Sequence, residues 1–188
     1  MAKQKWTFEP GHTAAEFSVR HMMVSNVRGH FKNVRGTLEI DPDNPMDVAV
    51  EAIISAKEIW TGEPDRDEHL RSADFLDVDN YPEITFTGNQ ATYLGENELR
   101  LTGIITIRGV TQEVTLDVLN QGQWDTPFWE DGVDKGPLKR AGFSAKGRIN
   151  RHDFGVSWND QLDKGGIVVG NEVEITIDVE ALLEPPTG

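Results

Sequence analysis

The chain of 188 residues contains no cysteine. A disulfide framework, a zinc–thiolate site and a thiol nucleophile are therefore excluded, and the redox compartment leaves no trace in the sequence. The first ten residues, MAKQKWTFEP, lack the apolar stretch of a secretory signal, and no apolar run approaches the length of a membrane span. These absences predict a cytoplasmic protein without stable membrane insertion, although the mature form of a periplasmic protein would look the same.

Basic residues are few: 18 lysines and arginines stand against 32 aspartates and glutamates, for a formal net charge of −14. Because a phosphate backbone requires a basic surface, this balance argues against nucleic-acid binding. Two stretches nevertheless contain no acid, one between Glu16 and Glu39 and one between Asp134 and Asp153. Their basic side chains either converge on an anionic group or form the solvated faces of two strands. They are Arg20, His21, Arg28, His30, Lys32 and Arg35 in the first stretch, and Lys135, Lys139, Arg140, Lys146, Arg148, Arg151 and His152 in the second.

Motifs for catalysis, metal binding and phosphate binding are also missing. His69, Ser72 and Asp74 are contiguous, with no G-x-S-x-G elbow, and contiguous polar residues rarely supply the geometry of a catalytic triad. No histidine pair has metal-ligand spacing, and neither a Walker loop nor G-x-G-x-x-G occurs. We therefore predict no catalytic residue, no metal site and no cofactor.

What the sequence does contain is alternation of apolar and polar residues with a period of two, which is typical of half-buried strands. Turn residues separate about nine such runs, and the combination predicts an all-β protein, either a closed barrel or a sandwich. Small residues among the inward positions, such as Ala52 and Gly103, would leave room for a cavity in a barrel. The clearest run places Val173, Ile175, Ile177 and Val179 opposite Glu174, Thr176, Asp178 and Glu180.

For three shorter segments the sequence predicts a helix or a turn. A short helix is predicted near Met22–Asn26, and another in "PDRDEHLRSADF" at 64–75, whose first-turn acids Asp65, Asp67 and Glu68 should face water. The segment "IRGVTQE" at 107–113 is predicted to be a tight hairpin turn with Gly109 at the bend.

Three blocks, in order along the chain, together resemble the YceI family. They are "FSVRHMMVSNVRGHF" at 17–31, "RDEHLRSADFLDVDNYPEITF" at 66–86 with "LTGIITIRGVTQEV" at 101–114, and "GFSAKGRINRHDFGVSW" at 142–158 with "VGNEVEITIDVE" at 169–180. The resemblance implies an extended eight-stranded antiparallel, lipocalin-like barrel with a short helix closing one end. It also implies a polyisoprenoid ligand, such as an isoprenoid quinone or a prenyl phosphate, in a long apolar pore. We expect a single domain over residues 1–184 and a loose tail at 185–188.

In this barrel the 64–75 segment would cross one end, with Leu70, Phe75 and Leu76 turned toward the interior. Alternation and the family blocks together predict a lipid tunnel, and guanidinium forks suit a diphosphate head group at its mouth. The tunnel residues are Phe17, Val19, Phe31, Ile54, Phe75, Phe86, Ile105 and Phe143, of which Phe31 and Phe75 come from the family blocks. The mouth residues are Arg20, His21, Arg28, Arg148 and Arg151. His69 and Arg71 either belong to the mouth as well or hold the 64–75 segment in place over it.

Two other functions are compatible with the sequence. The barrel interior could be packed solid, in which case the protein would work through its surface and bind no lipid. An enzyme acting on a prenyl compound is the other alternative, with His21 or His69 as its acid or base. The resemblance also suggests a homodimer, for which Trp124, Phe128 and Trp129 in "GQWDTPFWEDG" offer an apolar patch.

Overall fold

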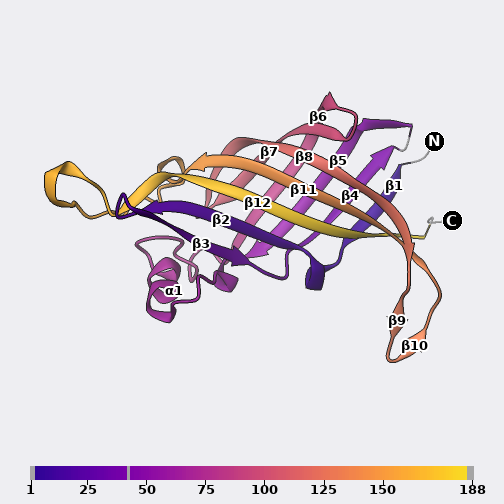
Figure 1. Cartoon of the computed structure of the whole chain (residues 1–188), viewed down its shortest axis with the longest axis horizontal. Helices are drawn as coiled ribbons and strands as arrows, with labels where there is room; N and C mark the ends of the chain where they lie inside the picture. Colours follow the sequence, from indigo (N-terminus) through magenta and orange to yellow (C-terminus); the bar gives the residue numbers. More distant parts are fainter. Residues whose placement is uncertain (1–2, 42, 186–188) are drawn as a thin grey trace.

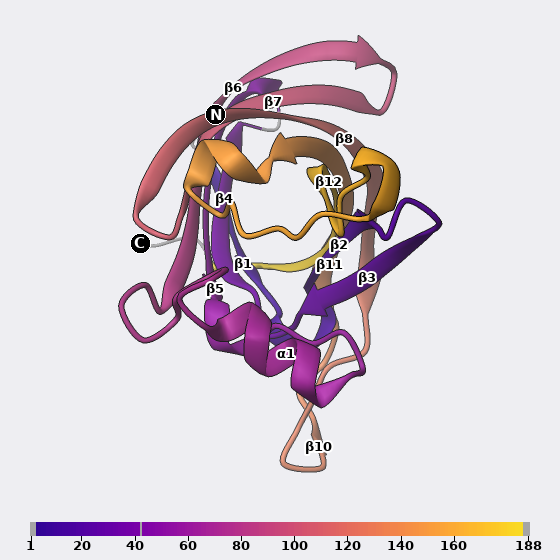
Figure 2. The ribbon, with the colours of Figure 1, turned by 90° about the vertical axis from the view of Figure 1, so that its left-hand side faces the viewer.

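In the computed structural model, which describes residues 3–41 and 43–185, eight antiparallel strands close into a barrel (Figures 1 and 2). Neighbouring strands pair in sequence order, and the first strand pairs with the last to complete the ring. The predicted barrel is thereby confirmed and the sandwich is not formed. The eight strands are β1 (Gln4–Phe8), β4 (Arg35–Asp41), β5 (Asn44–Ser55), β6 (Glu83–Gly95), β7 (Glu98–Ile107), β8 (Val110–Thr126), β11 (Leu138–Asn150) and β12 (Val169–Leu183).

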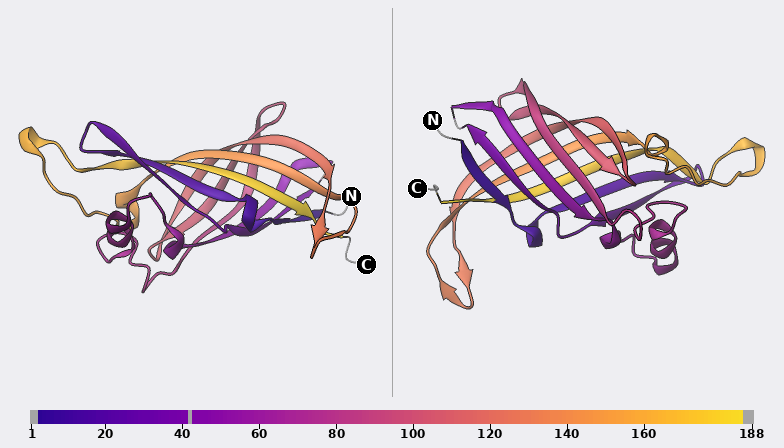
Figure 3. Two further views of the ribbon diagram at one scale, coloured as in Figure 1. Left: turned by 60° about the horizontal axis from the view of Figure 1, so that its bottom comes forward. Right: turned by 180° about the vertical axis from the view of Figure 1, so that it is seen from behind.

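Two further strands, β2 (Ala14–His21) and β3 (Ser25–Phe31), form a hairpin that lengthens the wall at one end of the barrel (Figure 1). β1 and β2 both pair with β12, and the short 3-10 helix η1 (Pro10–His12) separates them. At the opposite end lie the two chain termini and the small hairpin of β9 (Trp129–Glu130) and β10 (Val133–Asp134), as Figures 1 and 3 show.

The apolar faces that the alternation predicts for the strands form the barrel interior. Inward positions on every barrel strand are apolar, and on β12 they include the four aliphatic residues that the alternation singles out. The β7–β8 connection is the predicted hairpin turn: Ile107 pairs with Val110, and Arg108 and Gly109 both have positive φ, at 50° and 72°. A two-residue turn of this kind matches the twist of the strands it joins.

The helix predicted near Met22–Asn26 is wrong. Met22, Met23 and Val24 form the turn of the β2–β3 hairpin, and His21 pairs with Ser25 across it. Met22 and Met23 have φ of 51° and 60°, a left-handed conformation that a right-handed helix does not contain. The predicted loose tail at 185–188 lies outside the described residues except for Pro185.

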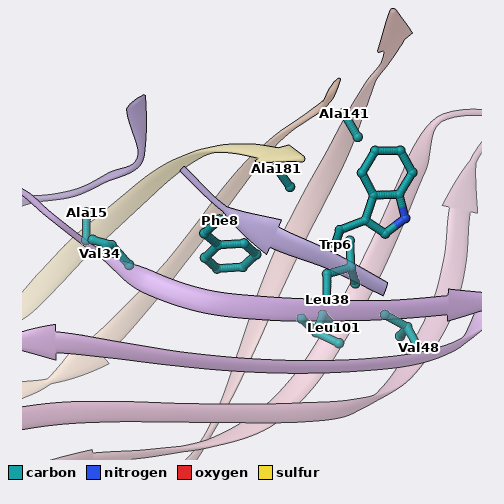
Figure 4. Packing of buried hydrophobic residues seen from close by; sticks show 9 residues of the cluster. All are labelled: Trp6, Phe8, Ala15, Val34, Leu38, Val48, Leu101, Ala141 and Ala181. Atoms are coloured by element: carbon teal, nitrogen blue, oxygen red, sulfur yellow. The ribbon is translucent and has the colours of Figure 1, made fainter. Parts of the chain in front are cut away.

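Two clusters of buried side chains close the two ends of the barrel. At the end near the termini, Trp6 and Phe8 of β1 pack against Leu38, Val48 and other aliphatic side chains (Figure 4). At the other end, Phe75, Phe154 and Val156 pack with residues at the ends of several strands. The barrel interior lies between these clusters.

Arg140 on β11 ties the closing strand pair together. Its Nε–H group lies 3.2 Å from Glu9 Oε2 and 2.6 Å from Glu180 Oε1, and its Nη1 donates to Pro127 O at 3.2 Å. Partial burial alone would raise the pKa of Glu9, but hydrogen bonds from Arg140 and with Glu180, together with the Arg140 charge, bring that pKa below its ordinary value of 4.5. The ionised form of Glu9 therefore stabilises the folded state.

Replacing Arg140 by Met should lower the free energy of unfolding by about 1–2 kcal/mol at pH 7. Because the pKa of Glu9 is lowered by folding, this stabilisation is complete above pH 4.5 and disappears as the pH falls through the folded-state pKa. Urea denaturation from pH 3 to pH 7 measures the difference between wild type and variant. A difference that does not shrink at low pH would contradict this role. Arg100→Met, at the exposed Arg100–Asp117 pair, should change stability less.

Candidate ligand-binding cavity

The barrel contains a cavity of about 290 Å³ that runs between the two end clusters. Side chains from every barrel strand and from β2 and β3 line it, and nearly all of them are aliphatic or phenylalanine. Glu16 also borders the cavity, but its position on β2 alternates with the inward residues and it is exposed. A wall of this composition suits an apolar ligand and offers few hydrogen bonds to a polar one.

Glycines on the inner face allow phenylalanine rings to lie flat against the wall. A Cβ atom on Gly103 would lie 2.6 Å from the ring of Phe86 and 2.5 Å from the carbonyl oxygen of Thr87. A Cβ on Gly29 would lie 2.5 Å from the ring of Phe17. Any larger residue would push these rings into the cavity, so the glycines keep its centre open.

All eight predicted tunnel residues line this cavity. Phe17 and Val19 come from β2, Phe31 from β3, Ile54 from β5, Phe86 from β6, Ile105 from β7 and Phe143 from β11, and Phe75 follows the helix. Lining residues that the sequence did not point to include Phe8, Val34, Ile59, Phe154 and Val156. Phe8 alternates with Trp6 in "QKWTF" and could have been found by parity, whereas the other four lie outside the regular strands.

The segment between β5 and β6 closes the end of the cavity, and we call residues 56–80 the lid. It contains the 3-10 helix η2 (Ala56–Glu58) and the helix α1 (Pro64–Arg71), followed by turns. Leu70, Phe75 and Leu76 border the cavity, as predicted. Figure 2 looks along the barrel from this end, with α1 on one side of the opening and the orange segment after β11 across it.

Asp67 is buried, which corrects the prediction that it faces water. Its Oδ1 accepts hydrogen bonds from the backbone N–H of Thr61 at 2.8 Å and from Thr61 Oγ1 at 2.5 Å. The chain before α1 folds back over the first turn of the helix, and a pattern within the helix alone does not reveal that contact. Asp65 and Glu68 are exposed.

Asp67→Ala should loosen the lid, because it leaves two donors of Thr61 without their acceptor. We expect a loss of about 1–3 kcal/mol in the free energy of unfolding and faster hydrogen exchange across residues 60–72. Asp65→Ala, on the exposed side of the same helix turn, is the matched control. Equal exchange rates in the two variants would show that Asp67 does not hold the lid.

Three more polar side chains at the lid end, those of Arg71, His69 and Arg108, make contacts with lid residues. Arg71 donates to the carbonyl oxygens of Lys57, at 2.9 Å, and Ile59, at 2.7 Å. His69 Nε2 lies 2.9 Å from Asp74 Oδ2, and its ring stands edge-on to Phe75 and Trp158. Arg108, which the sequence did not single out, joins the β7–β8 turn to Ala73 O and Gly155 O. The Arg71 and His69–Asp74 contacts hold the lid together, whereas Arg108 and the His69–Trp158 ring contact tie it to the rest of the barrel.

Arg151 begins the 3-10 helix η3 (Arg151–Phe154) and is 5% exposed. Its guanidinium donates to four carbonyl oxygens, those of Val156, Trp158, Val169 and Gly170, at 2.8 to 3.1 Å. Burial lowers the pKa of this group. Arg151 also borders the cavity, and among the described residues no carboxylate pairs with it. It is a buried positive charge at the lid end.

The other predicted mouth residues lie outside the cavity lining. Arg20 and Arg28 are exposed on β2 and β3, with Arg20 Nη2 donating to Met23 O at 2.9 Å. His21 is half-buried at the end of β2. Arg148 is exposed on β11 and pairs with Glu172 and Glu174 at 3.5 and 3.1 Å. The structure thus brings Arg151 to the cavity and leaves these four at the barrel's outer surface or rim.

Fold and cavity define the class of this protein: an extended, closed antiparallel β-barrel with an apolar cavity inside and a lid at one end. The chain belongs to the YceI-like domain family, whose family model matches residues 6–181. Protein YceI of Salmonella newport is 37% identical to it over 181 residues, covering 96% of this chain and 87% of that protein.

Solved structures agree with this assignment. The Campylobacter jejuni YCEI protein superposes with a TM-score of 0.71 at 27% identity, over 88% of this chain and 90% of that one. A polyisoprenoid binding domain from Saccharophagus degradans has a TM-score of 0.64 at 12% identity, covering 95% and 98% of the two chains, and shows the same fold.

In residues 3–41 and 43–185, no cluster of His, Asp and Glu has the geometry to hold a metal ion. Within the same residues, no helix has the length and apolar character needed to traverse a bilayer.

Proposed function

We propose that this protein binds a polyisoprenoid lipid, of the isoprenoid quinone or prenyl phosphate type, inside the barrel. The observation that carries the proposal is the apolar wall contributed by every strand around the cavity. A branched hydrocarbon tail gains about 25 cal/mol for each Å² of apolar surface that it removes from water, without directional bonds. The YceI family assignment and the name of the Saccharophagus domain support the same ligand class.

The head group is proposed to lie at the lid end, near Arg151. The guanidinium uses four of its N–H groups on backbone carbonyls, but its charge is not neutralised by a carboxylate among the described residues. A phosphate or a quinone carbonyl placed there would meet a positive potential in a poorly hydrated site. The tail would then extend toward Phe8 and the end where the termini lie.

Binding, without a chemical step, is the role proposed, in carriage, storage or sensing of the lipid. An enzyme acting on a prenyl compound would instead convert the bound lipid into a changed product, which the experiment below detects. A homodimer stays a prediction: Trp124 and Trp129 are 64% and 63% exposed, whereas Phe128 is half-buried.

The test is to purify the protein without detergent and to analyse its organic extract by mass spectrometry. A stoichiometric compound with the repeating mass of isoprene units would support the proposal and identify the head group. If the extract is empty, a short-chain isoprenoid quinone is titrated into the protein and binding is followed by tryptophan fluorescence. No binding in either experiment would overturn the proposal and favour a role carried by the protein surface.

A further inference from the structure

The turn between β2 and β3 exposes three consecutive apolar side chains. Met22, Met23 and Val24 are 40%, 52% and 78% exposed, at the tip of the hairpin that extends the barrel beside the lid (Figure 1). Exposed turns are normally built from Gly, Asn, Asp, Ser and Pro, which fit the backbone conformation of a turn or hydrogen-bond to its backbone. We call Met22–Val24 the apolar tip.

The apolar tip is held in place. The backbone N–H of Met22 donates to Val168 O at 2.7 Å, and that of Val24 donates to His21 O at 3.1 Å. Arg20 Nη2 binds Met23 O from the side. A Cβ on Gly166 would lie 3.4 Å from Met23 Cγ, so the long segment before β12 packs beside the tip. These side chains are therefore presented to the solvent by a supported turn, which lowers the entropy lost on binding.

Two arginines lie on the strands that carry the apolar tip, in a protein of net charge −14. Arg20 and Arg28 are exposed on the two strands that carry it, and neither has an ion-pair partner in the described part of the chain. The hairpin itself contains no acid after Glu16. The adjoining segment adds Lys164 together with Asp160 and Asp163, so the positive potential comes from β2 and β3.

The opposite end of the barrel offers an internal comparison. Val133 in the β9–β10 hairpin is 55% exposed, but Glu130, Asp131 and Asp134 flank it. The Nζ atom of Lys135 lies 3.7 Å from Glu130 Oε2, so this carboxylate offsets the positive charge of the lysine. Apolar exposure is thus combined with unpaired positive charge at the lid end and with negative charge at the other.

We propose that the apolar tip docks on an anionic lipid bilayer. Met22, Met23 and Val24 would enter the boundary between head groups and acyl chains, while Arg20 and Arg28 approach anionic lipids. The acidic remainder of the barrel is repelled by such a surface, so contact is made by the tip first and is reversible. This orientation brings the lid to the membrane and, resting on the proposed function, gives an isoprenoid lipid a short path into the cavity.

The direct test is co-sedimentation of the ligand-free protein with vesicles of phosphatidylethanolamine and phosphatidylglycerol in equal parts, compared with phosphatidylcholine alone. We expect binding to the anionic vesicles that weakens with salt, and about tenfold weaker partitioning for Val24→Asp. Val133→Asp makes the same change at the other end and should leave binding unaltered. Absence of wild-type binding, or an equal loss in both variants, would overturn the proposal.

A second copy of the chain is the competing occupant of the tip. Sedimentation velocity of wild type and Val24→Asp distinguishes the two: a dimer that Val24→Asp dissociates, with no difference in vesicle binding, would assign the tip to self-association and overturn the membrane proposal. If wild type and Val24→Asp have the same oligomeric state, the result agrees with docking on lipid.

Uptake experiments separate this inference from the proposed function. Val24→Asp should bind a water-soluble short-chain isoprenoid quinone as wild type does, because Val24 lies outside the cavity, but should extract a long-chain quinone from anionic vesicles about tenfold more slowly. If wild type binds vesicles but no quinone, the proposed function fails and the docking inference stands. If it binds quinone but not vesicles, only the docking inference fails.

Discussion

Phe86→Arg is expected to abolish retention of an isoprenoid ligand, lowering affinity by about a hundredfold or more. Phe86 lies in the wall of the cavity, with its ring over Gly103 and against Gly88. A guanidinium at this position would bring charge and water into a space that otherwise holds only hydrocarbon. The measurement is the amount of lipid in the organic extract, together with titration of a short-chain isoprenoid quinone.

Because a charge inside the barrel can also prevent folding, a second pair of variants keeps the prediction decisive. Ala52 borders the cavity on β5, whereas Ala49 on the same strand points to the outer face. Ala52→Phe should occupy the cavity and exclude the lipid, and Ala49→Phe should bind as wild type does. Circular dichroism and thermal unfolding establish that each variant is folded. Unchanged lipid uptake by folded Phe86→Arg or Ala52→Phe would refute the cavity as the binding site.

Arg151→Met should lower the free energy of unfolding by about 3–5 kcal/mol. The substitution keeps an apolar stem but leaves the carbonyl oxygens of Val156, Trp158, Val169 and Gly170 without their donors in a buried position. Arg151→Lys, which keeps the charge but has fewer donors in a different geometry, should fall between wild type and the Met variant. Guanidinium chloride denaturation, with equal slopes confirmed, gives the values.

Arg148→Met is the matched control for this prediction. Arg148 lies near the end of β11, three residues before Arg151, but is exposed, and its ion pairs with Glu172 and Glu174 are at the surface. Its removal should change the free energy of unfolding by less than about 1 kcal/mol. If Arg151→Met proves as stable as wild type, the guanidinium does not support the segment after β11 and its burial needs another explanation.

The strand faces were predictable because each depends on neighbouring residues alone. Alternation from Val173 to Val179 identifies the inner face of β12, and the turn at Arg108 and Gly109 follows from the short polar interval between two apolar runs. The Met22–Asn26 prediction failed for the opposite reason. Three apolar residues in a row resemble a buried segment, and nothing local indicates that they form an exposed turn between paired strands.

The polar residues of the candidate site depend on contacts that are distant in the sequence. Asp67 is buried because Thr61 folds back onto it, and Arg151 is buried because β12, which begins 18 residues later, supplies two of its carbonyl acceptors. Arg148, three residues earlier in the same acid-free stretch, lies on the outer face. The sequence could therefore identify both arginines as candidates. Only the three-dimensional arrangement shows that Arg151 borders the cavity and that Arg148 does not.

Closure of the barrel by its first and last strands has a consequence for how the protein is made. β1 pairs with β12 through Trp6–Leu183, Thr7–Leu182 and Phe8–Ala181, contacts that join opposite ends of the chain. On the ribosome, the ring cannot close until β12 has emerged, and contacts of such long sequence separation form slowly. Until then the inner, apolar face of the unclosed sheet is exposed to water. A chaperone, or the lipid itself, can cover that face during synthesis.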